Sequence, residues 1–249
     1  MEINKNKNKI YLTNLFIIDW DDTLFPTSWI NKNSIDFNRP NTYTEYKLYF
    51  LELDKTISNL LESLNSVGDV WVVTNASIKW IKSCLMVLNK TRDVVIKNNI
   101  RIVSARDSYS QNNSSPTEWK ILTFQDIIED ILNKISKNMK PNTYINIISV
   151  GDAMYEYIAL INLDNFLKSF VVKKSLTNQQ TNQTNQANQA NQANQANQVT
   201  QKNFNYLLKN IKFIEKPEFD LVIDQMHVLD KNKEMIINKL EFIDLKFSH

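Results

Sequence analysis

The hydrophobic pattern of the chain alternates between two kinds of segment. Short continuous apolar runs, rich in β-branched residues, are typical of buried strands of a parallel sheet. Longer segments with an apolar residue every three or four positions are typical of helices that pack on such a sheet. The pattern predicts strands at 15–18, 69–75, 100–104, 144–150, 170–172 and 211–214. It predicts helices at 43–66, 77–89, 115–136 and 153–162, and a last long helix from Pro217.

This alternation predicts one α/β domain over residues 1–249, a Rossmann-like parallel sheet with helices on both faces. Right-handed crossovers join consecutive strands in such folds. The polar and aromatic segment 26–42 is predicted to be a loop that leaves the tip of the first strand and roofs it. The last segment, 204–249, completes the fold and carries no recognisable chemistry.

Two segments do not follow the pattern. Residues 1–10 alternate lysine with asparagine, which predicts a solvated polar tail. Residues 176–203 repeat Asn-Gln with Thr or Ala, and alanine is the main apolar residue of that repeat. Such a tract cannot offset the entropy of ordering, so we expect a disordered insertion. Assembly through this tract is an alternative, but its lack of aromatic residues favours a neutral expansion.

Composition and charge exclude several classes of function. A net charge of +2 is too small to indicate electrostatic binding of nucleic acid or of a membrane surface. The single cysteine, Cys84, cannot form an internal disulfide, and an intracellular, cytoplasmic setting is favoured. Two histidines cannot build a His-rich zinc site. We expect no membrane span and no cleaved signal peptide, and the oligomeric state stays open.

Glycine is scarce, which limits the possible phosphate-binding loops. The only two glycines are Gly68 and Gly151. A P-loop and a dinucleotide fingerprint both need several glycines close together, so both are excluded. Gly68 follows a predicted helix, a position that favours a left-handed helix end.

Polar side chains gather where the predicted strands end. Because carboxyl ends of parallel strands meet at one edge of the sheet, we expect these residues to lie close together. They are Asp19, Asp21 and Thr23, then Thr74 and Asn75, then Asp152 and Glu156. Crowded carboxylates need a cation or a shared proton. The alternative is that the Asp run forms a solvated turn or a helix cap.

A lysine could complete this cluster, and three candidates exist. Lys79 and Lys82 follow the second strand of the chain, whereas Lys120 lies in the helix that opens at Ser115 and Pro116. We favour Lys120, because the positive end of its helix should face the same cleft. Each of the three could instead be a solvated surface lysine.

In order and spacing these residues resemble the motifs of the haloacid dehalogenase-like (HAD) hydrolases. Asp19, Asp21 and Thr23 match the first motif, D-x-D-x-T, and Thr74 matches the Ser or Thr of the second. Lys120 matches the lysine of the third. Gly151-Asp152 followed by Glu156 matches the fourth, although aspartate is commoner at the last position. The resemblance covers about residues 15–158 and implies a HAD-like fold with a minimal cap domain or none.

The resemblance implies a Mg²⁺-dependent phosphatase that forms an aspartyl-phosphate. It implies that Asp19 is the nucleophile and that Asp21 is the general acid and base. Thr23 would brace the turn after the strand through its hydroxyl. Thr74, Asn75 and Lys120 would bind the phosphoryl group. Carboxylate oxygens suit Mg²⁺, and the implied ligands are Asp19, Asp21, Asp152 and Glu156.

The second carboxylate narrows the reaction class. By resemblance, dehalogenases lack an acid at position 21 and P-type ATPases carry a lysine there, so Asp21 favours a phosphatase or phosphotransferase. The gaps 25–68 and 76–115 leave no room for a full cap domain, which predicts an open site for a large or phosphoprotein substrate. The alternative is a non-catalytic phosphate-binding or scaffold protein that keeps the fold alone.

Overall fold

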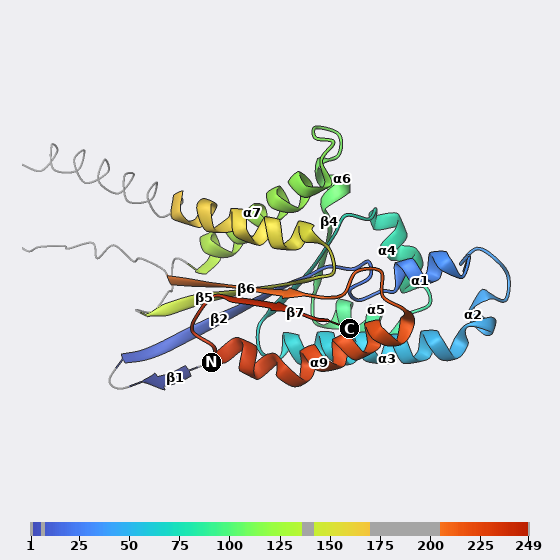
Figure 1. The fold of residues 1–249 in the computed structure, drawn as a ribbon, viewed down its shortest axis with the longest axis horizontal. Coiled ribbons are helices and arrows are strands. Elements are labelled where there is room, and N and C mark those ends of the chain that lie inside the picture. The colour runs from blue at the N-terminus through green and yellow to red at the C-terminus, as the bar shows by residue number, and fades with distance from the viewer. Residues whose placement is uncertain (1, 6–7, 136–141, 170–204, 249) are drawn as a thin grey trace, which may run out of the picture.

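The computed structural model describes residues 2–5, 8–135, 142–169 and 205–248. Its centre is a seven-stranded sheet with the order β4-β3-β2-β5-β6-β7, with β1 paired to β2 outside this path (Figure 1). All pairs are parallel except β1 with β2. The strands are β1 (Glu2–Lys5), β2 (Asn8–Ile18), β3 (Asp69–Thr74), β4 (Arg101–Ser104), β5 (Thr143–Gly151), β6 (Asn205–Lys212) and β7 (Ile243–Lys246).

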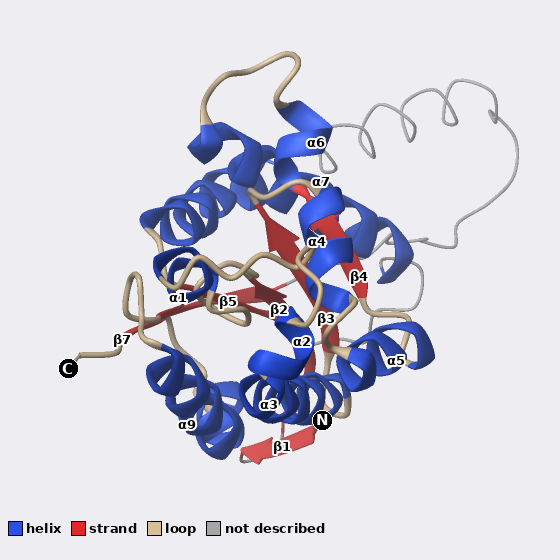
Figure 2. Ribbon diagram, turned by 90° about the vertical axis from the view of Figure 1, so that its right-hand side faces the viewer, coloured by secondary structure: helices blue, strands red, loops and turns tan. Residues whose placement is uncertain are grey.

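Helices cover both faces of this sheet, which confirms the predicted fold class (Figures 1 and 2). The named helices are α1 (Thr27–Lys32), α2 (Thr42–Glu45), α3 (Lys47–Asn65), α4 (Ile78–Leu85), α5 (Asn89–Lys97), α6 (Ala105–Tyr109), α7 (Pro116–Ile135) and α9 (Phe219–Asn238). Residues 154–169 form a further helix. No helix in the described part of the chain has the length and apolar character that crossing a membrane requires.

The strands bury apolar side chains on both faces because successive side chains point in opposite directions. In β2, Phe16 and Ile18 belong to the larger core, which α3 and α9 cover. Leu15 and Ile17 belong to the second core, which α7 and the helix 154–169 cover. The central strand is therefore buried on both faces, as its continuous apolar run predicts.

Several predicted elements differ from the structure. Segment 26–42, predicted as a loop, contains α1, which Ile30 anchors in the core. The helix predicted at 77–89 ends at Leu85, and α5 follows it. The strand predicted at 211–214 is the end of β6, where Lys209 and Asn210 interrupt the apolar pattern. The strand β7 was not predicted. The predicted strand 170–172 and insertion 176–203 lie outside the described residues.

The start of the chain and Gly68 also depart from expectation. Within residues 1–10, β1 pairs with the beginning of β2 where a solvated tail was predicted. Gly68 does not have the left-handed conformation expected of it, since neither glycine has a positive φ. A Cβ at this position would lie 2.6 Å from the Asn14 carbonyl oxygen, so the glycine is required by close packing against β2.

Candidate active site

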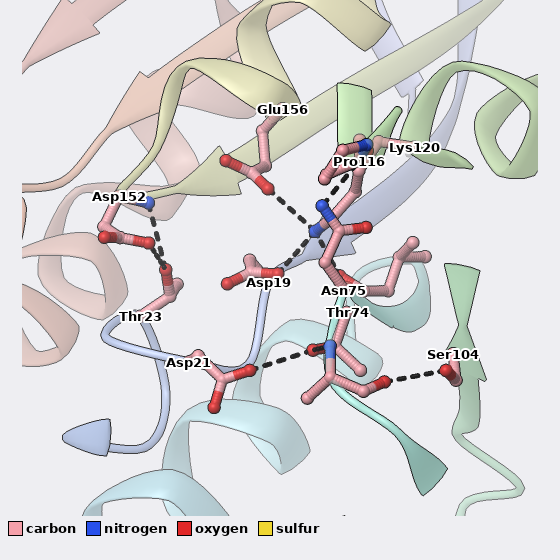
Figure 3. Close-up of polar contacts among 12 residues, drawn as sticks. Asp19, Asp21, Thr23, Thr74, Asn75, Ser104, Pro116, Lys120, Asp152 and Glu156 are labelled. Atoms are coloured by element: carbon pink, nitrogen blue, oxygen red, sulfur yellow. Dashed lines mark hydrogen bonds and ion pairs between the residues drawn. The ribbon is translucent and has the colours of Figure 1, made fainter. Parts of the chain in front are cut away.

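The tip of β2 turns back on itself within six residues. The Asp19 N–H donates to the Val150 carbonyl at 2.9 Å, and the Leu24 and Phe25 N–H groups donate to the Trp20 carbonyl at 3.0 and 2.8 Å. Trp20 and Phe25 stack, and both are buried. This turn buries the apolar side chains and directs the carboxylates of Asp19 and Asp21 toward the carboxyl edge of the sheet (Figure 3).

Lys120 reaches the tip of β2 from the first turns of α7. Its ammonium group donates to Asp19 Oδ1, donates to the Val73 carbonyl at 2.6 Å, and lies 2.7 Å from Glu156 Oε1. The side chain is 1% exposed, so these partners replace water. Lys120 therefore joins the ends of β2 and β3 to the helix 154–169 at one point (Figure 3).

The charges around Lys120 do not balance. Burial lowers the pKa of Lys120, but the carboxylates of Asp19 and Glu156 together raise it by more. The pKa of Lys120 is therefore above its ordinary value, and the ammonium keeps its proton. Burial raises the pKa of Asp19 well above its ordinary value, and Lys120 opposes this only in part. The charges of Glu156, Asp21 and Asp152 also raise the pKa of Asp19. The site thus holds more negative charge than one lysine neutralises.

Asp152 lies at the end of β5, where Thr23 ties it to the turn after β2. Its N–H donates to Thr23 Oγ1 at 3.0 Å, and the Thr23 hydroxyl lies 3.4 Å from Asp152 Oδ1. The Lys212 ammonium donates to the Asp152 carbonyl oxygen. Burial, together with the charges of Glu156 and Asp22, raises the pKa of the Asp152 carboxyl to about 7. Thr23 therefore holds two strand ends together, the bracing role expected of it.

Three donors hold the Asp21 carboxylate. The Thr74 hydroxyl donates to Oδ2 at 3.1 Å, the Trp80 indole N–H donates to Oδ1 at 2.9 Å, and the Thr27 hydroxyl donates to Oδ1. Thr74 Oγ1 also accepts from the Ala76 N–H at 2.9 Å. In this structure the Thr74 hydroxyl, predicted to bind phosphate, orients Asp21.

Asn75 and the alternative lysines occupy different positions from Lys120. The Asn75 side chain donates to the Pro116 carbonyl at 3.1 Å, which ties the end of β3 to the start of α7. Its Oδ1 is buried and has no partner within the described residues. Lys79 and Lys82 are exposed on α4. Of the three candidate lysines, Lys120 is the one that contacts Asp19.

The predicted magnesium ligands do not all converge. Among the described residues, no group of three or more His, Cys, Asp or Glu side chains is arranged to hold a metal ion. Glu156 instead contacts Lys120. Three donors hold Asp21, whereas Asp19 contacts Lys120 through Oδ1 alone. Asp19 and Asp152 both have a raised pKa that a cation would relieve. Mg²⁺ is commonly held by one or two carboxylates, with water and substrate oxygens filling the other positions, so this pair fits it.

The structure adds residues to the site that the sequence analysis missed. Trp80 and Thr27 contact Asp21, and Lys212 contacts Asp152. Lys212 was missed because the predicted strand 211–214 placed it inside a strand, whereas β6 ends at this residue. Gly151 is needed here because a Cβ would lie 2.4 Å from Cγ of Glu156. No local signal marks Trp80, since its contact with Asp21 depends on how α4 packs.

Comparison with known proteins leaves the family open. A scan against protein-family models, a search of curated proteins and a search of solved structures each found no match to this chain. Only the residues themselves and their arrangement therefore bear on the function.

Proposed function

We propose that the chain is a Mg²⁺-dependent phosphatase of the HAD type that acts through an aspartyl-phosphate on Asp19. The observation that carries this proposal is the convergence of Asp19, Asp21, Lys120 and Asp152 at one edge of the sheet (Figure 3). These residues come from the ends of two strands, β2 and β5, and from α7, and the sequence resemblance assigns them to one reaction.

The first step uses the free oxygen of the Asp19 carboxylate. Lys120 contacts Oδ1, which leaves Oδ2 on the side where Thr23 and Asp152 lie (Figure 3). In the proposed reaction this oxygen attacks phosphorus, the bond from phosphorus to the leaving oxygen breaks, and an aspartyl-phosphate forms. Lys120 holds the nucleophile in place and offsets charge that develops on the phosphoryl oxygens.

Asp21 handles the proton in both steps. It lies two residues from Asp19, and its carboxylate is oriented by Thr74, Trp80 and Thr27. It first gives a proton to the leaving oxygen and then takes one from the water that attacks the aspartyl-phosphate. That second attack breaks the bond from Asp19 to phosphorus, releases inorganic phosphate, frees the Asp19 carboxylate and returns a proton to Asp21.

Asp19 and Asp152 are the residues that would hold Mg²⁺. The ion would supply positive charge that lets an anionic carboxylate approach an anionic phosphate. Asp152 is positioned for this by Thr23 and by the contact of its carbonyl with Lys212. Glu156 contacts Lys120 directly, so we assign it to the lysine rather than to the ion.

The described residues form no separate cap domain over the proposed site. Between β2 and β3 the chain forms α1, α2 and α3, and α3 packs against α5 and α9. α3 belongs to the layer that covers the sheet, and α1 and α2, of six and four residues, are too short to form a separate cap domain. This arrangement supports the proposal of a large substrate, such as a phosphoprotein.

Hydrolysis of an aryl phosphate tests the proposed function. We expect the intact chain to release phosphate with Mg²⁺ and not with EDTA. Asp19→Asn should lower the rate about a thousandfold or more, because the nucleophile is lost. Asp93→Asn, an exposed carboxylate on α5, is the matched control and should leave the rate unchanged. An Asp19→Asn rate equal to that of the intact chain would refute the mechanism and favour the non-catalytic alternative.

A further inference from the structure

A cavity of about 350 Å³ lies next to the tip of β2 and has no role in the reaction described above. Its walls come from α1 and from the connection between β6 and α9. Its lining includes Ser28, Trp29, Asn31, Lys32, Lys216 and Glu218. The volume falls within the range of pockets that bind small organic groups.

The cavity adjoins the candidate active site through two contacts. In its wall, Ser28 donates its N–H to Asp22 Oδ1 at 2.7 Å and its hydroxyl to Asp22 Oδ2, and Asp22 directly follows Asp21. The connection that forms the other wall begins at Lys212, which donates to the carbonyl of Asp152. The two segments that enclose the cavity therefore also hold the ends of β2 and β5.

The cavity carries two ammonium groups and one carboxylate. Lys32 pairs with Glu218, and both side chains are largely exposed. Lys216 has no carboxylate oxygen within ion-pair distance among the described residues, although its charge acts on Asp22. One positive charge in the cavity wall is thus left without a direct partner.

The backbone at Lys216 supports a role for this side chain. Its φ is 49°, in the left-handed region that non-glycine residues rarely adopt. Such conformations persist where the surrounding structure fixes them, and they are common at ligand sites. Here the strained residue is the one whose ammonium group has no ion-pair partner.

We infer that this cavity binds the leaving group of the phosphate ester, and that this group carries a second anion, a phosphate or a carboxylate, that pairs with Lys216. The inference rests on the proposed phosphatase function. Its physical reason is charge: Asp19, Asp21, Asp22 and Asp152 repel an anionic substrate, and a cation beside them offsets that repulsion. Asn31 and Ser28 supply further polar groups, and Trp29 supplies an apolar wall.

Three related substrates test this inference with the full-length chain. Propanediol monophosphate has a neutral hydroxyl tail, propanediol bisphosphate has a second phosphate, and phosphorylated hydroxybutyrate has a carboxylate tail. We expect kcat/KM to be about tenfold higher for an anionic tail than for the neutral tail, since charge-assisted hydrogen bonds are strong. Comparing the bisphosphate with phosphorylated hydroxybutyrate shows whether the site prefers a phosphate or a carboxylate.

Two substitutions should move this preference in opposite directions. Lys216→Gln should raise KM about tenfold for the anionic tails and leave the neutral tail within about twofold. Glu218→Gln removes the carboxylate from the cavity, so it should lower KM for the anionic tails. Lys231→Gln, on the exposed side of α9, is the matched control. Misfolding could not produce opposite effects on one substrate.

Equal kcat/KM values for all three substrates would overturn the inference, and so would a Lys216→Gln effect that is the same for each. Calorimetric binding of propanediol bisphosphate to the Asp19→Asn chain separates this outcome from failure of the proposed function. Binding that depends on Lys216, without hydrolysis by the intact chain, would refute the phosphatase and leave the anion site standing. Hydrolysis that depends on Asp19, without any preference for anionic tails, would do the reverse.

Discussion

Two buried lysines lie in different surroundings, and the contrast shows what marks a chemical site. Lys120 contacts the carboxylates of Asp19 and Glu156 at the carboxyl edge of the sheet. Lys209, on β6, donates to the carbonyls of Ile236 and Ile237 at the end of α9. Both are almost completely buried. A buried cation therefore does not identify an active site; the kind of partner does.

The surroundings of Lys209 satisfy backbone groups. Asn146 donates to Asn14 Oδ1 at 2.9 Å and to the Ile237 carbonyl at 3.1 Å, and Asn14 donates to the Val67 carbonyl at 2.7 Å. We call Asn14, Gly68, Asn146 and Lys209 the Lys209 cluster. It closes the C-terminal end of α9, where the last carbonyls have no partner within the helix. The polar groups of the Lys209 cluster hydrogen-bond backbone carbonyls and so stabilise the fold, whereas the groups around Lys120 are mainly charged carboxylates.

The largest expected contrast is in activity. Lys120→Met should lower aryl phosphate hydrolysis about a thousandfold, because Asp19 loses its partner and the phosphoryl charge is no longer offset. Lys209→Met has the same change of side chain and should leave kcat/KM within about twofold. Steady-state kinetics of the two variants under one condition make the comparison. Similar losses in both would show that the two lysines do not differ in the way proposed.

The next contrast concerns Asp152 and the stability of the metal-free chain between about pH 4 and pH 7. Because burial raises the pKa of Asp152 to about 7, the folded state binds more protons than the unfolded state in this window. The free energy of unfolding should therefore fall as pH rises, by up to about 1.4 kcal/mol per pH unit. Urea titrations at several pH values should show a shallower fall for Asp152→Asn.

Added Mg²⁺ should change the pH dependence of stability. An ion bound by Asp19 and Asp152 favours their charged forms, so Mg²⁺ should stabilise the chain more at pH 8 than at pH 5. The Asp152→Asn chain should show a smaller stabilisation. Equal stabilisation of both chains at both pH values would argue against an ion at these two carboxylates.

The Lys209 cluster should show the opposite pH dependence in a different window. Burial lowers the pKa of Lys209 to about 8, and Lys239 contributes to the shift. Between about pH 8 and pH 10.5 the unfolded state binds more protons, so the free energy of unfolding should rise with pH by at most about 1.4 kcal/mol per unit. Lys209→Met should remove that rise in urea titrations. A rise that persists in this variant would assign it to another group.

The smallest contrast is between the two glycines. A Cβ at Gly68 meets the Asn14 backbone, which cannot move alone, so Gly68→Ala should cost about 1–3 kcal/mol of stability and spare activity. A Cβ at Gly151 would meet the Glu156 side chain instead of backbone, so Glu156 would have to leave its place beside Lys120. Gly151→Ala should therefore cost less stability and lower activity, because Lys120 loses one carboxylate. Melting curves and kinetics on both variants check the pair.

The sequence predicted much of the fold because its strands are buried on both faces. A continuous apolar run such as Leu15–Ile18 has few alternatives to a central strand. Elements with weaker patterns were missed for a physical reason. Lys209 and Asn210 interrupt the run in β6, and the short strand β7 has one buried residue at its start. Tertiary contacts compensate for the polar residues there, and no local pattern records such contacts.

The sequence alone determined which acids and hydroxyls stand at the ends of strands and which lysine lies near the start of a helix, because the order of apolar runs fixes where strands stop. Only the tertiary structure decided how they share their contacts. In it Glu156 pairs with Lys120, and the Thr74 hydroxyl donates to Asp21. Trp80 contacts Asp21, and Lys212 contacts the Asp152 carbonyl. These contacts join residues far apart in the chain, and they depend on packing angles and burial that a linear pattern does not contain.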